Sequence, residues 1–75
     1  MVKALILINT DSGMENKVSE EIVRMNFVKE VHIVYGVYDV IVELEVNSYE
    51  ELRKAVSMIR SVSHVRSTTT LIIVK

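Results

Sequence analysis

Only a few side chains in the 75-residue sequence are of types that could bind a metal ion or attack a substrate. The two histidines, His32 and His64, fall in segments that the topology argued below places on opposite edges of a sheet, about three strand spacings of ~4.8 Å apart. They cannot share a metal ion within one chain. The sequence has no cysteine, no serine in a nucleophile-elbow turn and only two glycines. It therefore predicts no metal site, no cofactor, no nucleophilic catalysis and no glycine-rich phosphate loop.

A turn rich in tyrosine is the first segment whose chemistry suggests a ligand. It reads Tyr35-Gly36-Val37-Tyr38-Asp39. Glycine permits a positive φ, exposed backbone N–H groups bind anions, and the carboxylate of Asp39, one residue after an aromatic, can bind an ammonium group. Such a turn could hold both charged ends of a free amino acid. On chemistry alone, an ordinary hairpin turn in which Asp39 bonds the local backbone is the simpler interpretation.

A run of hydroxyl side chains is the second such segment. It comprises Ser67, Thr68, Thr69 and Thr70, at the start of a stretch that otherwise has the composition of a core strand. Threonine favours strands, so strand propensity and partial exposure can account for the run. Four consecutive hydroxyls nevertheless point to both faces of a sheet. Those on a buried or interfacial side are costly unless a polar ligand satisfies them.

Both segments must be positioned by the elements around them. Apolar, β-branched runs predict four strands, at Val2–Ile8, Val28–Tyr35, Val40–Val46 and Val65–Val74. Apolar residues at three- and four-residue spacing predict two helices, over about Met14–Asn26 and Tyr49–Ser61. A capping box precedes each helix, Ser12 with Glu15 and Ser48 with Glu51.

The predicted element order is βαββαβ, in two βαβ halves. A shift of 34 positions lays the apolar residues of the first helix onto those of the second, namely Val18, Ile22 and Met25 onto Leu52, Val56 and Ile59. Right-handed crossovers in both halves give a ferredoxin-like α+β fold with an antiparallel four-stranded sheet, order 4-1-3-2, and two helices on one face. Residues 1–75 then form a single domain.

The helix-free face of this sheet is predicted to be apolar. Ala4, Ile6 and Ile8 alternate with Leu5 and Leu7, so both faces of a central strand carry aliphatic side chains, where an open sheet face would show polar ones. A few exposed aliphatics could be tolerated. A chain this short, with no disulfide, gains only roughly 3–5 kcal/mol from its own core. We therefore expect a homodimer that covers this face.

Charge and hydropathy restrict the partners further. Nine Lys and Arg residues against ten Asp and Glu give a net charge of −1, which provides no positive field for phosphates. No direct nucleic-acid partner is expected. The longest apolar runs, Ala4–Ile8 and Leu71–Val74, fall far below the ~18 residues of a membrane span, and the N-terminus lacks a signal-peptide pattern. The expected location is cytoplasmic, with no membrane partner.

The turn and the hydroxyl run together resemble a known family. The sequence VYGVYDVIV at residues 34–42, followed by a helix and by HVRSTTT at residues 64–70, resembles the effector-binding domain of the Lrp/AsnC (leucine-responsive, feast/famine) transcriptional regulators. This is also called the RAM domain, and the resemblance covers essentially the whole chain. It implies a ferredoxin-like subunit that dimerises through its sheet, with dimers joining into rings that are often octamers. It also implies an amino-acid effector held between neighbouring dimers.

The resemblance also implies site residues. Carried over by position, Gly36, Tyr38 and Asp39, with Val37 in the same turn, would hold the backbone groups of the effector, and Ser67 to Thr70 would supply hydroxyl contacts. The typical regulator has a helix-turn-helix domain before this one, whereas here the first strand begins at Val2. The likeness is thus to the stand-alone RAM proteins, which could sense amino acids or mix with full-length Lrp/AsnC regulators in transcription regulation.

Two other functions fit the same topology. ACT domains bind amino acids near the turn after the first strand, and Asp11-Ser12-Gly13 partly matches their aspartate-x-proline-glycine pattern. A small dimeric ferredoxin-like enzyme, such as an α+β barrel monooxygenase, could use His32, Tyr38 or His64 as acid or base. That enzyme would need a cleft between sheet and helices, where this sequence places Ile22, Met25, Val56 and Ile59. A binding module, not an enzyme, is expected.

Overall fold

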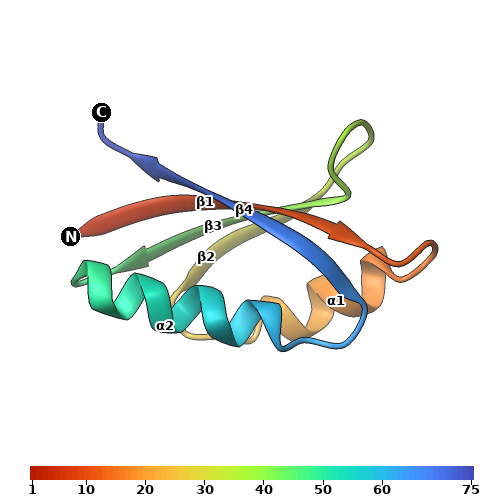
Figure 1. Cartoon of the computed structure of the whole chain (residues 1–75), viewed down its shortest axis with the longest axis horizontal. Coiled ribbons are helices and arrows are strands. Elements are labelled where there is room, and N and C mark those ends of the chain that lie inside the picture. The colour runs from red at the N-terminus through yellow and green to blue at the C-terminus, as the bar shows by residue number, and fades with distance from the viewer.

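The computed structural model describes the whole chain, residues 1–75 (Figure 1). The elements are β1 (Val2–Thr10), α1 (Glu15–Ile22), β2 (Val28–Ile33), β3 (Val40–Val46), α2 (Tyr49–Arg60) and β4 (Val65–Ile73). The strands pair antiparallel in the order β2-β3-β1-β4, and both helices cover one face of the sheet. The ferredoxin-like α+β fold and the strand order predicted from the sequence are confirmed.

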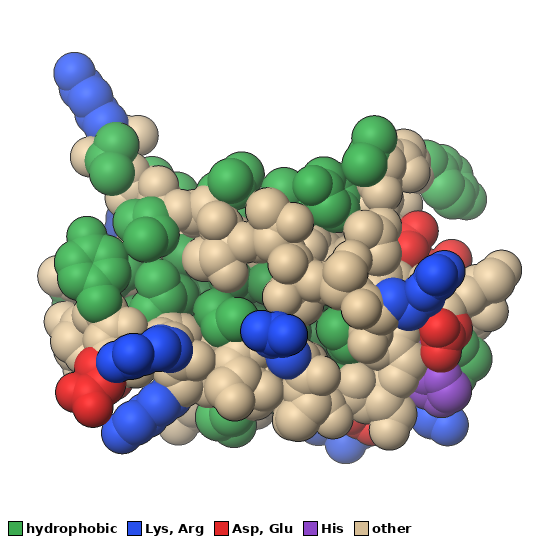
Figure 2. Space-filling model, viewed as in Figure 1, with side chains coloured by type: hydrophobic (Ala, Val, Ile, Leu, Met, Phe, Trp, Pro, Cys, Tyr) green, Lys and Arg blue, Asp and Glu red, His purple; other side chains and the backbone are tan.

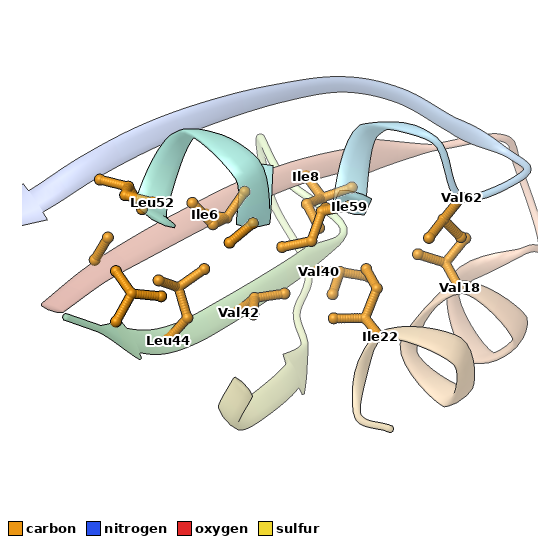
Figure 3. Close-up of a cluster of buried hydrophobic side chains, with 13 residues drawn as sticks. Ile6, Ile8, Val18, Ile22, Val40, Val42, Leu44, Leu52, Ile59 and Val62 are labelled. Carbon is orange, nitrogen blue, oxygen red and sulfur yellow. The ribbon is translucent and has the colours of Figure 1, made fainter. Parts of the chain in front are cut away.

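The core lies between the sheet and the helices (Figure 3). Every second residue of the central strands β1 and β3 points into it and meets buried side chains from both helices. The thirteen buried hydrophobic residues are Ala4, Ile6, Ile8, Val18, Ile22, Val40, Val42, Leu44, Val46, Leu52, Ala55, Ile59 and Val62. A catalytic cleft in this layer would have to displace them.

Helix α1 is shorter than its apolar pattern predicts. It ends at Ile22, and the predicted extension to Asn26 is wrong. Two tight turns follow, closed by the Met25 N–H donating to the Ile22 carbonyl at 3.0 Å and the Val28 N–H donating to the Met25 carbonyl at 3.1 Å. Met25 is half-buried against the core from this turn, not from a helix. Its apolar spacing therefore reflects burial and not helical continuation.

The two predicted capping boxes have different outcomes. Ser48 caps α2, because its Oγ accepts a hydrogen bond from the Glu51 N–H at 3.1 Å. The Glu51 carboxylate accepts from the Asn47 N–H at 3.0 Å, one residue before the cap. The Ser12 capping box is wrong. Met14 precedes the first residue of α1, and no side chain caps that helix.

The helix-free face of the sheet is only partly apolar, because Leu5 pairs with Glu43 and Lys3 pairs with Glu45 on it. Leu5, Leu7 and Ile41 are half-buried on it, and the β4 residues Leu71 and Ile73 remain 47% and 37% exposed. Figure 2 shows hydrophobic side chains along the upper margin of the molecule, on the side away from the helices. Neither helix is long and apolar enough to cross a membrane.

The difference between the two serines gives a matched test of the capping geometry. Ser48→Ala removes an N-cap acceptor, so we expect the free energy of unfolding to fall by about 0.5–2 kcal/mol. Ser12→Ala should change it by less than about 0.5 kcal/mol, because Ser12 caps nothing. Urea unfolding followed by circular dichroism measures both. Equal losses in the two variants would contradict the assignment.

Candidate functional site

The predicted turn and the predicted hydroxyl run approach each other at one end of β1. Because β1 lies between β3 and β4, the loop that leads into β3 and the start of β4 both flank the end of β1. A polar depression of about 310 Å³ lies there. We call it the Asp39 depression, and its lining residues are Asn9, Thr10, Asp39, Arg66 and Ser67. Charged side chains of both signs gather at this end of the molecule (Figure 2).

Asp39 is held in place by the backbone of β1. Its Oδ2 accepts a hydrogen bond from the Thr10 N–H at 2.9 Å, and its own N–H donates to the Ile8 carbonyl at 2.9 Å. The Asp39 carbonyl accepts from the Val34 N–H at 2.9 Å, which closes the loop at its base. The other carboxylate oxygen, Oδ1, has no hydrogen-bond partner within the chain. The structure therefore presents an oriented, half-buried carboxylate with one oxygen available.

The loop carrying the other predicted turn residues projects from the sheet. Strand β2 ends at Ile33, two residues earlier than predicted, so the connection to β3 is six residues long, Val34–Asp39. Gly36 has φ +134°, a conformation that other residues rarely adopt. Tyr35 and Val37 are exposed at the loop, and Tyr38 is half-buried. Gly36, Val37 and Tyr38 do not line the Asp39 depression within one chain.

The four hydroxyl residues of β4 divide between the two faces of the sheet. Ser67 pairs with Asn9, whose Nδ2 donates to the Ser67 Oγ at 3.1 Å. Thr69 pairs with Leu7 on the apolar face, whereas Thr70 pairs with buried Ile6 and lines a groove beside α2. Only Ser67 shares the Asp39 depression.

Thr68 belongs to a neighbouring depression of about 330 Å³. We call it the Arg60 depression, and its lining residues are Arg60, Val65, Arg66, Ser67 and Thr68.

Three residues of the Asp39 depression were not identified from the sequence: Asn9, Thr10 and Arg66. Arg66 lies where the pairing of β4 with β1 changes register, because Asn9 pairs with Ser67 and Thr10 pairs with Val65. This bulge leaves Arg66 without a partner across the sheet. No sequence pattern marks a bulge, so only the strand register reveals this arginine.

The two histidines lie apart, as their strands predict. His32 on β2 contacts the Glu30 carboxylate at 2.9 Å, and His64, just before β4, contacts the Asp11 carboxylate at 3.0 Å. Strands β2 and β4 are opposite edges of the sheet. No cluster of three or more metal-binding side chains occurs in the chain. Asp11 also lies 4.0 Å from the Arg66 Nε, so the first loop is linked to the bulge.

The whole chain matches a described family. Residues 3–75 match the model of the Lrp/AsnC ligand-binding domain. The chain belongs to this family. A hypothetical protein from Pyrococcus horikoshii is 37% identical, with a TM-score of 0.93 over 100% of this chain and 92% of that one. A protein from Thermus thermophilus is 30% identical, with a TM-score of 0.94 over 100% of this chain and 95% of that one.

Longer proteins contain a similar segment. Escherichia coli AsnC shares the fold, with a TM-score of 0.91 at 21% identity, and this Lrp/AsnC domain covers 99% of its own length and 51% of that chain. A homocitrate synthase from Sulfolobus acidocaldarius is 36% identical over 75 residues, which are 99% of this chain and 16% of the enzyme. The domain thus spans about a sixth of the curated relatives it matches. Its own family is a regulatory ligand-binding family and not an enzyme family.

The structural role of Asp39 can be tested without a ligand. Asp39→Ala removes the acceptor for the Thr10 N–H, so we expect the free energy of unfolding to fall by about 1–3 kcal/mol. Asp39→Asn keeps a carbonyl oxygen that can accept this hydrogen bond, so it should lower the free energy of unfolding by less than Asp39→Ala does. Urea unfolding at one protein concentration compares the two variants. An alanine variant as stable as the parent would show that this hydrogen bond does not anchor the loop.

Proposed function

We propose that this Lrp/AsnC domain binds a free amino acid in the Asp39 depression and senses its concentration. The observation that carries the proposal is the presence of one carboxylate and one guanidinium, Asp39 and Arg66, in a single polar depression. An amino acid has one group of each opposite sign. The ammonium would bind the free Oδ1 of Asp39, and the carboxylate would bind Arg66, with the Ser67 hydroxyl between them.

The site is incomplete within one subunit, which supports binding between neighbouring dimers. The depression of about 310 Å³ is at the lower end of ligand-pocket sizes and is lined by five polar residues only. The loop residues Gly36, Val37 and Tyr38 stand beside it, and Val37 is 83% exposed. In the proposal, such a loop from a neighbouring dimer closes over the ligand and adds its backbone N–H groups. Thr68, Thr69 and Thr70 would contribute hydroxyls from the adjoining surfaces of the assembly.

The dimer itself is proposed to form through the helix-free sheet face. Leu5, Leu7, Ile41, Leu71 and Ile73 form an apolar patch on this face, beside the charged residues Lys3, Glu43 and Glu45, and a second chain would cover the patch. Dimers would then associate into a ring, up to an octamer, through the ends of the sheet that carry the loops. Mixed assembly with full-length Lrp/AsnC regulators would use the same surfaces.

The first ligand experiment is a thermal-shift screen of the twenty amino acids, followed by calorimetry. Asp39→Asn should lower the affinity for the best ligand about tenfold or more, because it removes the charge from a hydrogen bond worth about 1.5–3 kcal/mol. Glu21→Gln, an exposed change on α1, is the control and should leave the affinity unaltered. Unchanged affinity in Asp39→Asn would contradict the proposed site. It would favour the loop at Asp11-Ser12-Gly13 instead.

The dimer proposal has its own test. Leu71→Lys places a charge on the apolar face, at a side chain that is 47% exposed in the single chain, so it should disrupt the dimer more than the fold. Val23→Lys, just after α1 and 56% exposed, is the matched control and should leave the dimer intact. Light scattering at micromolar concentration measures the mass. A parent protein that is monodisperse at 8.6 kDa would overturn the proposal.

A further inference from the structure

The two edge strands of the sheet, β2 and β4, differ in how they are protected from pairing with another chain. Natural proteins place charged side chains on an exposed edge, because its unpaired backbone groups can bind a further strand. Strand β2 carries Lys29, Glu30 and His32 within its six residues. Strand β4 carries only Arg66, near its start, and the stretch STTTLII at residues 67–73 has no charge and no proline. The β4 edge is therefore open to pairing with a further strand.

A groove runs beside this edge, on the helix side of the sheet. It has a volume of about 590 Å³, and its lining comes from Thr70 of β4 and from residues of α2 between Tyr49 and Arg60. Tyr49 is 64% exposed, and Ile72, on the same face of β4 as Thr70, is 44% exposed. Strand β4 and helix α2 lie nearest the viewer in Figure 1, so Figure 2 shows this side of the molecule, where hydrophobic and basic side chains are visible. Helix α2 thus leaves the edge strand only partly covered.

The groove has an acidic residue at one end and a basic residue at the other. Glu50 lies in the first turn of α2 and Arg60 in the last turn, and both line the groove. Both are exposed, and neither takes part in the four ion pairs of the chain. Their positions in the helix place them about 15 Å apart, too far to pair with each other. Arg53, between them, also has no ion pair.

We propose that β4 pairs antiparallel with β4 of a second copy of the chain, across a two-fold axis near Thr70. A two-fold contact joins the same patch on both subunits, so the patch must be complementary to itself. The axis sets the two α2 helices side by side in opposite directions, and Glu50 of each copy then faces Arg60 of the other. Thr70 is both the strand residue of the groove and the middle of the uncharged stretch 67–73, so one axis can serve the strands and the helices.

This edge contact goes beyond the proposed function, because it requires no ligand. It uses neither the open-face patch nor the loop ends of the sheet. Backbone hydrogen bonds between the two β4 strands would join two four-stranded sheets into one continuous sheet. Two open-face dimers would thereby be held side by side, with the exposed Tyr49 and Ile72 side chains covered.

Charge reversal in the ligand-free protein tests the contact. Arg60→Glu and Glu50→Arg each place like charges opposite each other at both ends of the contact. Either variant alone should weaken the edge association about tenfold. An equimolar mixture of the two variants should return to within about threefold of the parent, because every facing pair then has opposite charges.

Sedimentation equilibrium measures the dissociation constant. The relevant step is dimer to tetramer, or monomer to dimer if the open-face dimer does not form. Lys54→Glu is the matched control, because Lys54 is exposed on the same helix but lies outside the groove, and it should leave the constant unaltered. Circular dichroism checks that each variant is folded. A mixture that associates no more tightly than either variant alone would overturn the proposal.

Hydrogen exchange compares the two edges of the parent protein directly. At concentrations above the dissociation constant, the amides of residues 67–73 that point away from β1 should exchange at least about tenfold more slowly than in dilute protein. The outward amides of β2 should exchange equally fast at both concentrations. Unprotected β4 amides would contradict the contact, and equal protection of both edges would show head-to-tail pairing of β4 with β2 instead. None of these measurements involves an amino acid, so the proposed ligand binding stands or fails separately.

Discussion

The position of β1 between β3 and β4 is the constraint on which the rest of this structure depends. A strand with two neighbours is shielded on both edges, and the end of β1 lies beside the first residues of both neighbours. Asp39 and Ser67 are 28 residues apart in the sequence, yet they line one depression because each is attached to the end of β1. The central strand thus supports the helix-side core with one set of side chains and the apolar open face with the other.

The small size of the chain favours covering the open face of the sheet with a second chain. A domain of this length buries only about 60% of the surface of its unfolded chain, so a second apolar surface is a cost unless another chain covers it. The Asp39 depression lies at the end of β1 on this same open face, because Asn9 and Ser67 are the next pair after Leu7 and Thr69. The dimer contact and the ligand site that we propose are therefore neighbours on one face of the sheet, so a bound ligand would lie close to the edge of the dimer contact.

Periodicity predicted the fold because each element has a regular pattern. The βαββαβ order with right-handed crossovers gave the strand order correctly, and Ser48 with Glu51 located the start of α2. Alternation in β1 gave the core face correctly, but the opposite face also carries Glu43 and Glu45 of β3. The same reasoning failed where residues with helix-like spacing lie in turns outside the helix. Met25 has helical spacing but packs from a turn, and Ser12 has capping spacing but is followed by Gly13 at φ +83°. Spacing alone does not distinguish a helix from a turn that buries the same side.

The site was harder to predict because it depends on strand register and not on local sequence. Asp39 was identified from its turn, but Arg66 faces both depressions only because β4 shifts by one residue against β1. His64, just before this shift, has φ +75°, which costs a non-glycine residue about 1–2 kcal/mol. Two contacts offset that cost, because the His64 carbonyl accepts from the Asp11 N–H at 2.9 Å and its ring lies 3.0 Å from the Asp11 carboxylate. The loop after β1 therefore stabilises the backbone that carries Arg66 into the Asp39 depression, both through these contacts to His64 and through the Asp11 carboxylate, which lies 4.0 Å from the Arg66 Nε.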